Sequence, residues 1–377
     1  MTEGKKNWWQ QCWEFTKNRK RKENRMMNQK INQIKRSPAF SGMILFFLFL
    51  IVYFGVQYLQ APESFWSIKT YRNFMSLFKS FSPLILVTMG QAFLMLMGII
   101  DISIGMQMSF ANVLAAMLPE ILGLPTPVAW LIALLATILL AVLNGVIVSC
   151  LRIPPLLAGF AMIYVIKGIN LLIAPKPGGK VPAIANQVFD SMLFGFIPFS
   201  LILLAVMYGI WLYLEKTPLI KAVYAIGGNE RNAYATGIHT TAIKIKIYAL
   251  AGFFTGLAGL CYTAAYTTGN PITGEIYGLQ SISACILGGI SLAGGWGNMA
   301  SAVYGVGFQI LVQTTVPKVF TMISKATGVN YNTYWHNLFS DIIILLGLVV
   351  TIFAIRAQRT TFISGLKKQI KGAKADE

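Results

Sequence analysis

The sequence predicts an all-α integral membrane protein, a polytopic bundle of about ten transmembrane helices with broken or re-entrant segments. Its composition supports this class, because 55% of the residues are hydrophobic and only 12% are charged, whereas roughly a quarter of a soluble domain is charged. The apolar residues gather in runs of about 20, the length that crosses a bilayer. Clusters of glycine interrupt several of these runs, which predicts breaks in the helices.

Ten apolar runs are candidate transmembrane helices, since a helix satisfies its own backbone hydrogen bonds where lipid cannot. In chain order they are 39–59, 81–98, 104–122, 127–149, 155–174, 197–214, 247–267, 279–295, 298–316 and 336–354. The eighth and ninth runs are short and contain glycine, so each is a candidate for a re-entrant segment.

The charged residues divide the chain into a basic arm at 1–36, a transmembrane domain at 37–355 and a basic tail at 356–377. Short loops rich in Lys and Arg stay cytoplasmic, and most of the 31 Lys and Arg lie on one side in the predicted topology. Both termini are therefore predicted to be cytoplasmic. The net charge of +18 is mostly in the two ends and suits an anionic lipid surface better than a nucleic acid.

The arm at 1–36 is too long for the start of a signal peptide, so the first apolar run is predicted to be an uncleaved helix. Two interpretations of the arm stay open. It is either an amphipathic helix lying in the membrane interface or a solvated basic segment that fixes the topology.

Residues for catalysis are scarce. The four cysteines stand alone, without the spacing of a metal site, and the chain has only two histidines. The sequence G-x-x-x-x-G-K-[ST], which cradles nucleotide phosphates, does not occur. Any transport driven by ATP therefore needs a separate subunit, and no cofactor or metal is predicted to bind this chain.

A first glycine-marked stretch, LMGIIDISIGMQMS from Leu96 to Ser109, places Asp101 and Ser103 between two apolar runs. A carboxylate at mid-bilayer costs on the order of 3 kcal/mol, so Asp101 is expected to face protein, water or a cation. One interpretation is a broken helix at a transport site. The other is a short turn near the cytoplasmic interface, with Asp101 capping the third helix.

A second stretch, LGGISLAGGWGNMAS from Leu287 to Ser301, is unusually rich in glycine. Each glycine costs a helix about 1 kcal/mol relative to alanine, so these residues are expected to allow a close helix approach or a tight reversal. A gate and a plain bend both fit. The glycines are Gly288, Gly289, Gly294, Gly295 and Gly297.

A third stretch, YAIGGNERNAYATGI, predicts a short helix from Glu230 to Thr236 in the longest cytoplasmic loop, 215–246. Two glycines break the chain before it, an asparagine is a good N-cap, and a glycine stops it. Such a short helix is marginal in water, so it is expected to dock on a partner. The residues that define it are Gly227, Gly228, Asn229, Glu230, Ala233 and Gly237.

These stretches together resemble the ABC-type monosaccharide import permeases, the ribose, xylose and galactose group of binding-protein-dependent inner-membrane components. GGNERNAYATGI resembles the coupling loop of that group, and LGGISLAGGWG resembles its LGG-SLAGG-G signature. MGIIDISIG is similar to its GGIDLSVG, and LNGVIVSCLRIPPLLAGFAMIYVIKGI to its NG–IPPFI–TLG–RG segment. The resemblance runs in order from about Ser82 to Ala354.

The resemblance implies a multi-pass permease of the bacterial cytoplasmic (inner) membrane. Its implied partners are cytoplasmic ABC ATPase subunits that bind ATP and Mg²⁺, an extracytoplasmic substrate-binding protein, and a second permease chain in a homodimer or heterodimer. The helix from Glu230 to Thr236 would seat in a groove of the ATPase. The sequence departs from the group at Ile99, usually glycine, and at Lys167, commonly arginine.

Amides, hydroxyls and closely packed glycines along the spans are candidates for a sugar path or gate. Each polar one has an alternative role in an interhelical hydrogen bond. An ion pair between Lys167 and Asp101 is possible, although nothing in their sequence spacing supports it. The candidates are Gln91, Asp101, Ser103, Asn144, Lys167, Asn170, Gln280, Gly288, Gly289, Gly294 and Gly295.

Other functions stay open at this point. Nucleosides and branched-chain amino acids are carried by related permeases. An ion-coupled secondary transporter would use titratable groups such as Asp101, Lys167 and Asp341. An integral-membrane enzyme is disfavoured, because no nucleophile, base or metal cluster emerges.

Overall fold

The computed structural model describes residues 37–193 and 195–354, so the predicted arm at 1–36 and tail at 356–377 lie outside the described residues. Helices dominate the described part of the chain, which confirms the predicted all-α membrane class. A two-residue antiparallel hairpin, β1 (Met192–Leu193) with β2 (Ile197–Pro198), is its only sheet within the described ranges.

Seven helices of the described residues are long and apolar enough to span a membrane. They are α2 (Phe40–Gln60), α3 (Ile68–Leu96), α5 (Thr126–Ser149), α6 (Pro155–Ile173), α11 (Thr240–Tyr266), α13 (Met299–Thr327) and α14 (Thr333–Ala354). An eighth candidate is the pair α8 (Phe199–Glu215) and α9 (Pro218–Gly228), bent by 77° at the break between them.

Two predicted spans correspond to helices outside that set, α4 (Ile104–Ile121) and α12 (Gly274–Gly288). Helix α12 has 15 residues, about 22 Å of helix, which is too short for a hydrocarbon core of about 30 Å. The eighth predicted span is therefore a partial helix that does not cross the membrane by itself. The ninth is not, because α13 runs for 29 residues, and the prediction that it is short was wrong.

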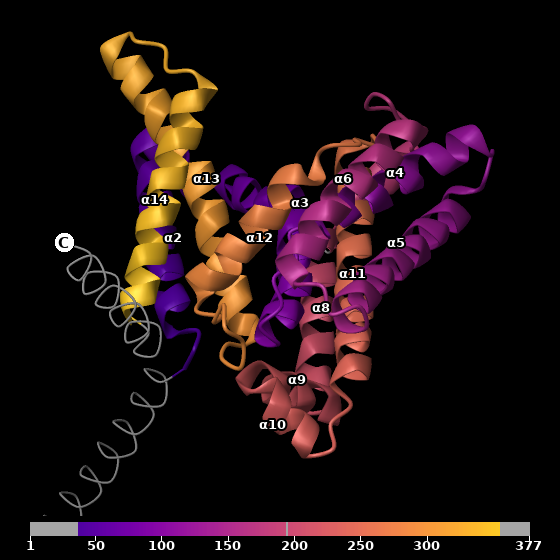
Figure 1. The fold of residues 1–377 in the computed structure, drawn as a ribbon. Coiled ribbons are helices and arrows are strands. Elements are labelled where there is room, and N and C mark those ends of the chain that lie inside the picture. Colours follow the sequence, from indigo (N-terminus) through magenta and orange to yellow (C-terminus); the bar gives the residue numbers. More distant parts are fainter. Residues whose placement is uncertain (1–36, 194, 355–377) are drawn as a thin grey trace, which may run out of the picture.

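The bundle has two distinguishable ends (Figure 1). Helix α9 and the short helix α10 (Glu230–Ala235) lie at one end, called here the α10 end. The connections from α4 to α5 and from α13 to α14 lie at the opposite end. The remaining short helices are η1 (Pro62–Ser64) and α7 (Ala183–Asp190).

Helix α11 is the centre of the larger half of the bundle, with α3, α4 and α5 packed around it (Figure 1). Small residues allow this close packing. A Cβ on Gly259 would lie 2.5 Å from the Ala111 Cβ, and one on Gly252 would lie 2.5 Å from the Ala141 Cβ. Since lipid provides no hydrophobic drive between helices, such close contacts are a main source of their association.

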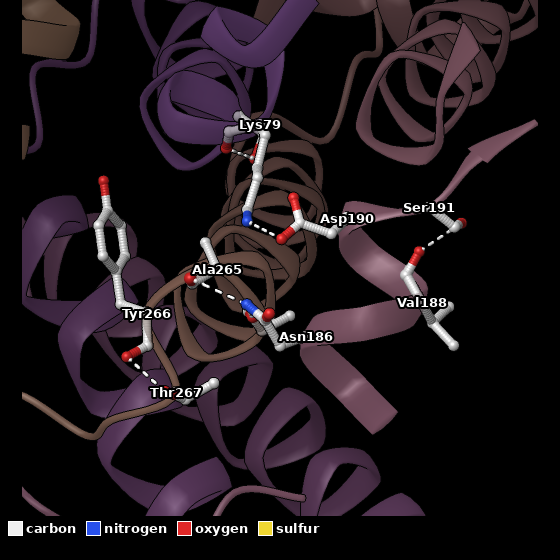
Figure 2. Close-up of polar contacts among 10 residues, drawn as sticks. Lys79, Asn186, Val188, Asp190, Ser191, Ala265, Tyr266 and Thr267 are labelled. Atoms are coloured by element: carbon white, nitrogen blue, oxygen red, sulfur yellow. Dashed lines mark hydrogen bonds and ion pairs between the residues drawn. The ribbon is translucent and has the colours of Figure 1, made fainter. Parts of the chain in front are cut away.

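Helix α7 is pinned across the opposite end of the bundle (Figure 2). Lys79 of α3 forms an ion pair of 2.5 Å with Asp190 at the end of α7. The Asn186 side-chain amide donates to the Ala264 carbonyl of α11 at 2.9 Å. Two turns of helix are thereby fixed to the ends of two spans, which gives this end a defined outer surface.

Candidate functional site

The three glycine-marked stretches meet at one point at the α10 end. The Gly295 amide donates to the Leu96 carbonyl at 2.9 Å. A Cβ on Gly227 would lie 2.1 Å from that carbonyl oxygen and 2.4 Å from the Gly295 nitrogen. A Cβ on Gly294 would lie 2.5 Å from the Gly98 nitrogen. We call these five residues the glycine junction; it joins the ends of α3 and α9 to the loop 289–298.

Backbone conformation also demands glycine in this junction. Gly98, Gly294 and Gly295 have φ of 75°, 82° and 70°, a left-handed region that side chains disfavour. The Tyr224 hydroxyl of α9 adds a hydrogen bond of 2.7 Å to the Gly297 carbonyl. The sequence alone missed this meeting, because the three stretches lie far apart along the chain.

Helix α10 closely matches the predicted short helix. It ends at Ala235, one residue before the predicted end, and the Asn229 side chain accepts the Asn232 amide at 3.0 Å as the expected N-cap. Gly237, with φ of 88°, ends the turn as predicted. One expectation was wrong: α9 continues through both glycines at 227 and 228, and the break falls at Asn229, whose backbone is extended.

The faces of α10 have different surroundings. Ala233 is 4% exposed and packs on the bundle, and Glu230 forms an ion pair of 2.6 Å with Lys244 of α11. Arg231 and Tyr234 are exposed, Tyr234 by 69%. One side of α10 is thus fixed to the bundle, and the other side exposes the cationic Arg231 and the aromatic Tyr234.

Asp101 lies inside the bundle, 1% exposed, between α3 and α4. Its Oδ1 accepts the Ser103 amide at 2.8 Å and the Ser103 hydroxyl at 2.6 Å. Its Oδ2 accepts the Asn144 amide at 2.9 Å and the Gln107 amide at 3.4 Å. Asp101 therefore stabilises the turn before α4 within a buried polar network, and its side chain does not cap the helix, whose N-cap residue is Ser103. Gln107 was missed, although it follows Ser103 by one helical turn.

Lys167 pairs with Glu275 of α12, and the ion pair with Asp101 that the sequence left possible is not formed. The Asp101 carboxylate is enclosed by its own hydrogen-bond donors and by Gly159. Lys167 and Glu275 are 35% and 42% exposed. Lys167 lies twelve residues after Pro155, about 18 Å along α6. The partly exposed ion pair therefore lies about 9 Å from the Ile173 end of α6.

The segment 267–273, which leads from α11 into α12, is not helical, and side chains from α4 and α6 satisfy its backbone. Asn112 donates to the Thr268 carbonyl at 2.8 Å and accepts the Asn270 amide at 2.6 Å. The Ser109 hydroxyl donates to the Asn270 carbonyl at 2.5 Å. The Asn170 amide donates to the Pro271 carbonyl at 3.1 Å. This allows irregular backbone inside a membrane protein.

The remaining candidates are dispersed. Gln91 of α3 is fully buried and its amide has no partner among the described residues, while Gln280 is half-buried on α12. A Cβ on Gly288 would lie 1.8 Å from the Ser301 carbonyl oxygen, and one on Gly289 would lie 2.2 Å from the Pro38 carbonyl oxygen. These two glycines let the end of α12 pack tightly on its neighbours.

The architecture is that of a polytopic permease, with a short exposed helix at one end and a partial helix inside. The chain belongs to the family described as "Branched-chain amino acid transport system / permease component", whose model matches residues 73–348. It is therefore a multi-pass membrane permease component and not a catalytic enzyme.

Characterised relatives within this family import small solutes. The chain is 31% identical to the ribose import permease protein of Bacillus subtilis, over 62% of this chain and 73% of the relative. It is 27% identical to the galactose/methyl galactoside import permease protein of Haemophilus influenzae (74% and 85%). It is 32% identical to the autoinducer 2 import system permease protein of Escherichia coli (72% and 77%). No solved structure matches the chain significantly.

Proposed function

We propose that the chain is the membrane subunit of an ATP-driven importer that takes a simple sugar from an extracytoplasmic binding protein. The observation that supports it most is α10, held to the bundle by Ala233 and by the Glu230–Lys244 pair while Arg231 and Tyr234 point outward. A docking element needs this combination, because it must transmit force to the bundle as well as bind. Its partner would be an ATPase subunit carrying ATP and Mg²⁺.

In this proposal the α10 end is cytoplasmic, as are both termini, and the membrane is the bacterial inner membrane. Cations support that side, since Lys216, Lys221, Lys244 and Lys246 all flank α9 and α10, and loops rich in Lys and Arg stay cytoplasmic. The pinned helix α7 would then lie outside, where Ile184 (66% exposed) offers apolar surface to a binding protein.

A second copy of the chain, or a related permease, would complete the path. Charged groups at mid-bilayer depth cost on the order of 3 kcal/mol each when they face lipid, so the surface bearing Lys167 and Glu275 is better covered by a partner or by water. Asp101, enclosed by hydrogen bonds, has no exposed surface for an ion-coupled mechanism.

Of the predicted path residues, we assign Lys167 and Gln280 to the path wall, because both are partly exposed. The internal polar residues and the tightly packed glycines support the shape of the subunit. These supporting residues are Gln91, Asp101, Ser103, Asn144, Asn170, Gly288, Gly289, Gly294 and Gly295.

Changing Tyr234 to alanine should weaken the binding of the ATPase to the permease, so that little ATPase copurifies. A buried aromatic anchor at an interface is often worth 2 kcal/mol or more, roughly a thirtyfold loss of affinity. The measurement is affinity purification of the permease in mild detergent, with the copurified ATPase quantified by mass spectrometry. Ala233 is a poor site for this test, because it is buried and its replacement would disturb packing.

The matched control is Tyr334→Ala, since Tyr334 is 81% exposed in the first turn of α14, and the connection from α13 to α14 lies at the end opposite α10 (Figure 1). It should retain the ATPase. Recovery of wild-type permease without any ATPase, under conditions that preserve a known importer, would contradict the proposed function. So would uptake that stops when ion gradients collapse but survives depletion of ATP.

A further inference from the structure

Three tyrosines gather where α11 ends and α12 begins. The rings of Tyr262 and Tyr266 have centroids 4.5 Å apart and are tilted by 37°, and Tyr277 meets Tyr262 edge-on at 6.5 Å. The Thr273 hydroxyl donates to the Tyr262 hydroxyl at 3.0 Å. The structure thereby joins two helices through aromatic rings and hydroxyls, using residues from both sides of the segment 267–273.

This cluster is open to the surface of the subunit. Tyr266 is 47% exposed, and its ring points away from the contact that Asn186 makes with the end of α11 (Figure 2). Tyr262, Thr273 and Tyr277 are half-buried. Aromatic rings with their hydroxyls are therefore accessible to a small molecule.

The side of α12 that carries the cluster combines a phenol with an amide. Gly274 and Gly278 turn inward, where a Cβ would meet the backbone of Gly105 and of Ile102. Tyr277 and Gln280 are three residues apart and lie on one side of α12, whereas the exposed Ile276 and Leu279 point to another side. The Gln280 amide gives the tyrosine side a group that both donates and accepts hydrogen bonds. An interfacial belt of tyrosine, the other common use of this residue in membranes, would not need it.

We propose that Tyr262, Tyr266 and Tyr277, with Thr273 and Gln280, form a binding site for an uncharged polyhydroxylated ring on the substrate path. Sites for small ligands combine apolar and aromatic surface with a few polar groups that fix orientation. The rings offer flat apolar surface to the C–H face of a sugar, while phenol, hydroxyl and amide groups exchange hydrogen bonds with its hydroxyls. This site rests on the proposed function and names where the sugar is held.

Accessibility provides the first test. In a background without the four cysteines, Gln280→Cys would be exposed to a charged, membrane-impermeant methanethiosulfonate in the reconstituted permease–ATPase complex. Leu172→Cys is the control, because Leu172 is 85% exposed on α6 and apolar. The cysteine at 280 should react at least about tenfold faster, since the reacting thiolate forms in water and not in lipid. Saturating D-ribose or D-galactose should slow its reaction.

Transport provides the second test. Tyr277→Ala should lower the initial rate of ATP-driven uptake of radiolabelled D-ribose or D-galactose about tenfold, the effect of losing roughly 1.4 kcal/mol of ring contact. Tyr58→Ala should keep the wild-type rate, because Tyr58 is 51% exposed on α2, away from this face. Both variants are compared at equal amounts of assembled complex, so that a folding defect does not count as a binding defect.

Three results would overturn the site while leaving the proposed function standing: no labelling at 280 above the control at 172, labelling that neither sugar slows, or wild-type uptake by Tyr277→Ala. Failure of the proposed function has a different signature. In that case the wild-type complex, with its binding protein, would take up neither sugar on addition of ATP.

Discussion

Replacing Gly227 by alanine should abolish ATP-driven uptake. The new Cβ would lie 2.1 Å from the Leu96 carbonyl oxygen and 2.4 Å from the Gly295 nitrogen, both backbone atoms that cannot rotate away. The end of α9 would have to move off the end of α3 and off the loop 289–298. Because α10 continues directly from α9, the same change would cut the connection between the proposed ATPase contact and the membrane helices.

The neighbouring glycine supplies the matched control. A Cβ on Gly228 would have no atom within 4 Å, so Gly228→Ala should transport at close to the wild-type rate. Both variants are reconstituted in vesicles with ATPase and binding protein, and uptake is compared with ATPase content. If Gly227→Ala transported as well as Gly228→Ala, the glycine junction would have no part in transmitting force from α10.

The second large effect is expected for Asp101→Ala, which should destabilise the permease by about 2–5 kcal/mol. The change removes the acceptor of four hydrogen bonds, donated by Ser103, Asn144 and Gln107, at a site that is 1% exposed. Donors left without partners in such a site cost more than the lost bonds themselves. The measurement is the apparent Tm of the purified protein in one detergent.

Two further variants make that prediction specific. Asp101→Asn should recover part of the loss, because a carboxamide keeps an oxygen for Ser103 and can donate to the Asn144 carbonyl oxygen, which is unpartnered. Asp341→Asn removes an exposed carboxylate of α14 and should leave the apparent Tm within the small range of surface changes. Equal Tm values for Asp101→Ala and wild type would show that the network does not stabilise the bundle.

Local features were predictable from the sequence, and distant contacts were not. The N-cap at Asn229 and the stop at Gly237 depend on residues within one or two turns, so α10 was placed to within one residue. The start of α3 at Ile68 was missed, because its first turns mix Lys69, Arg72 and other polar residues with aromatics and do not form an apolar run.

The candidate site shows the same division. The stretches that contain Gly98, Gly227 and Gly294 were each recognised as unusual. A glycine in the sequence indicates a close backbone contact, but it does not indicate which segment makes that contact. The partner of Lys167 was not identified from the sequence for the same reason. Glu275 is remote in sequence and becomes its neighbour only because α12 begins inside the bundle.

The irregular segment 267–273 also has a consequence for biogenesis. Its backbone groups are satisfied by Ser109 and Asn112 of α4 and by Asn170 of α6, all of which are synthesised before it. Helix α12 is too short to enter the bilayer as an independent span. We expect α12 to insert by packing against α4 and α6, which are synthesised and folded before it. The order of synthesis would then also be the order of assembly.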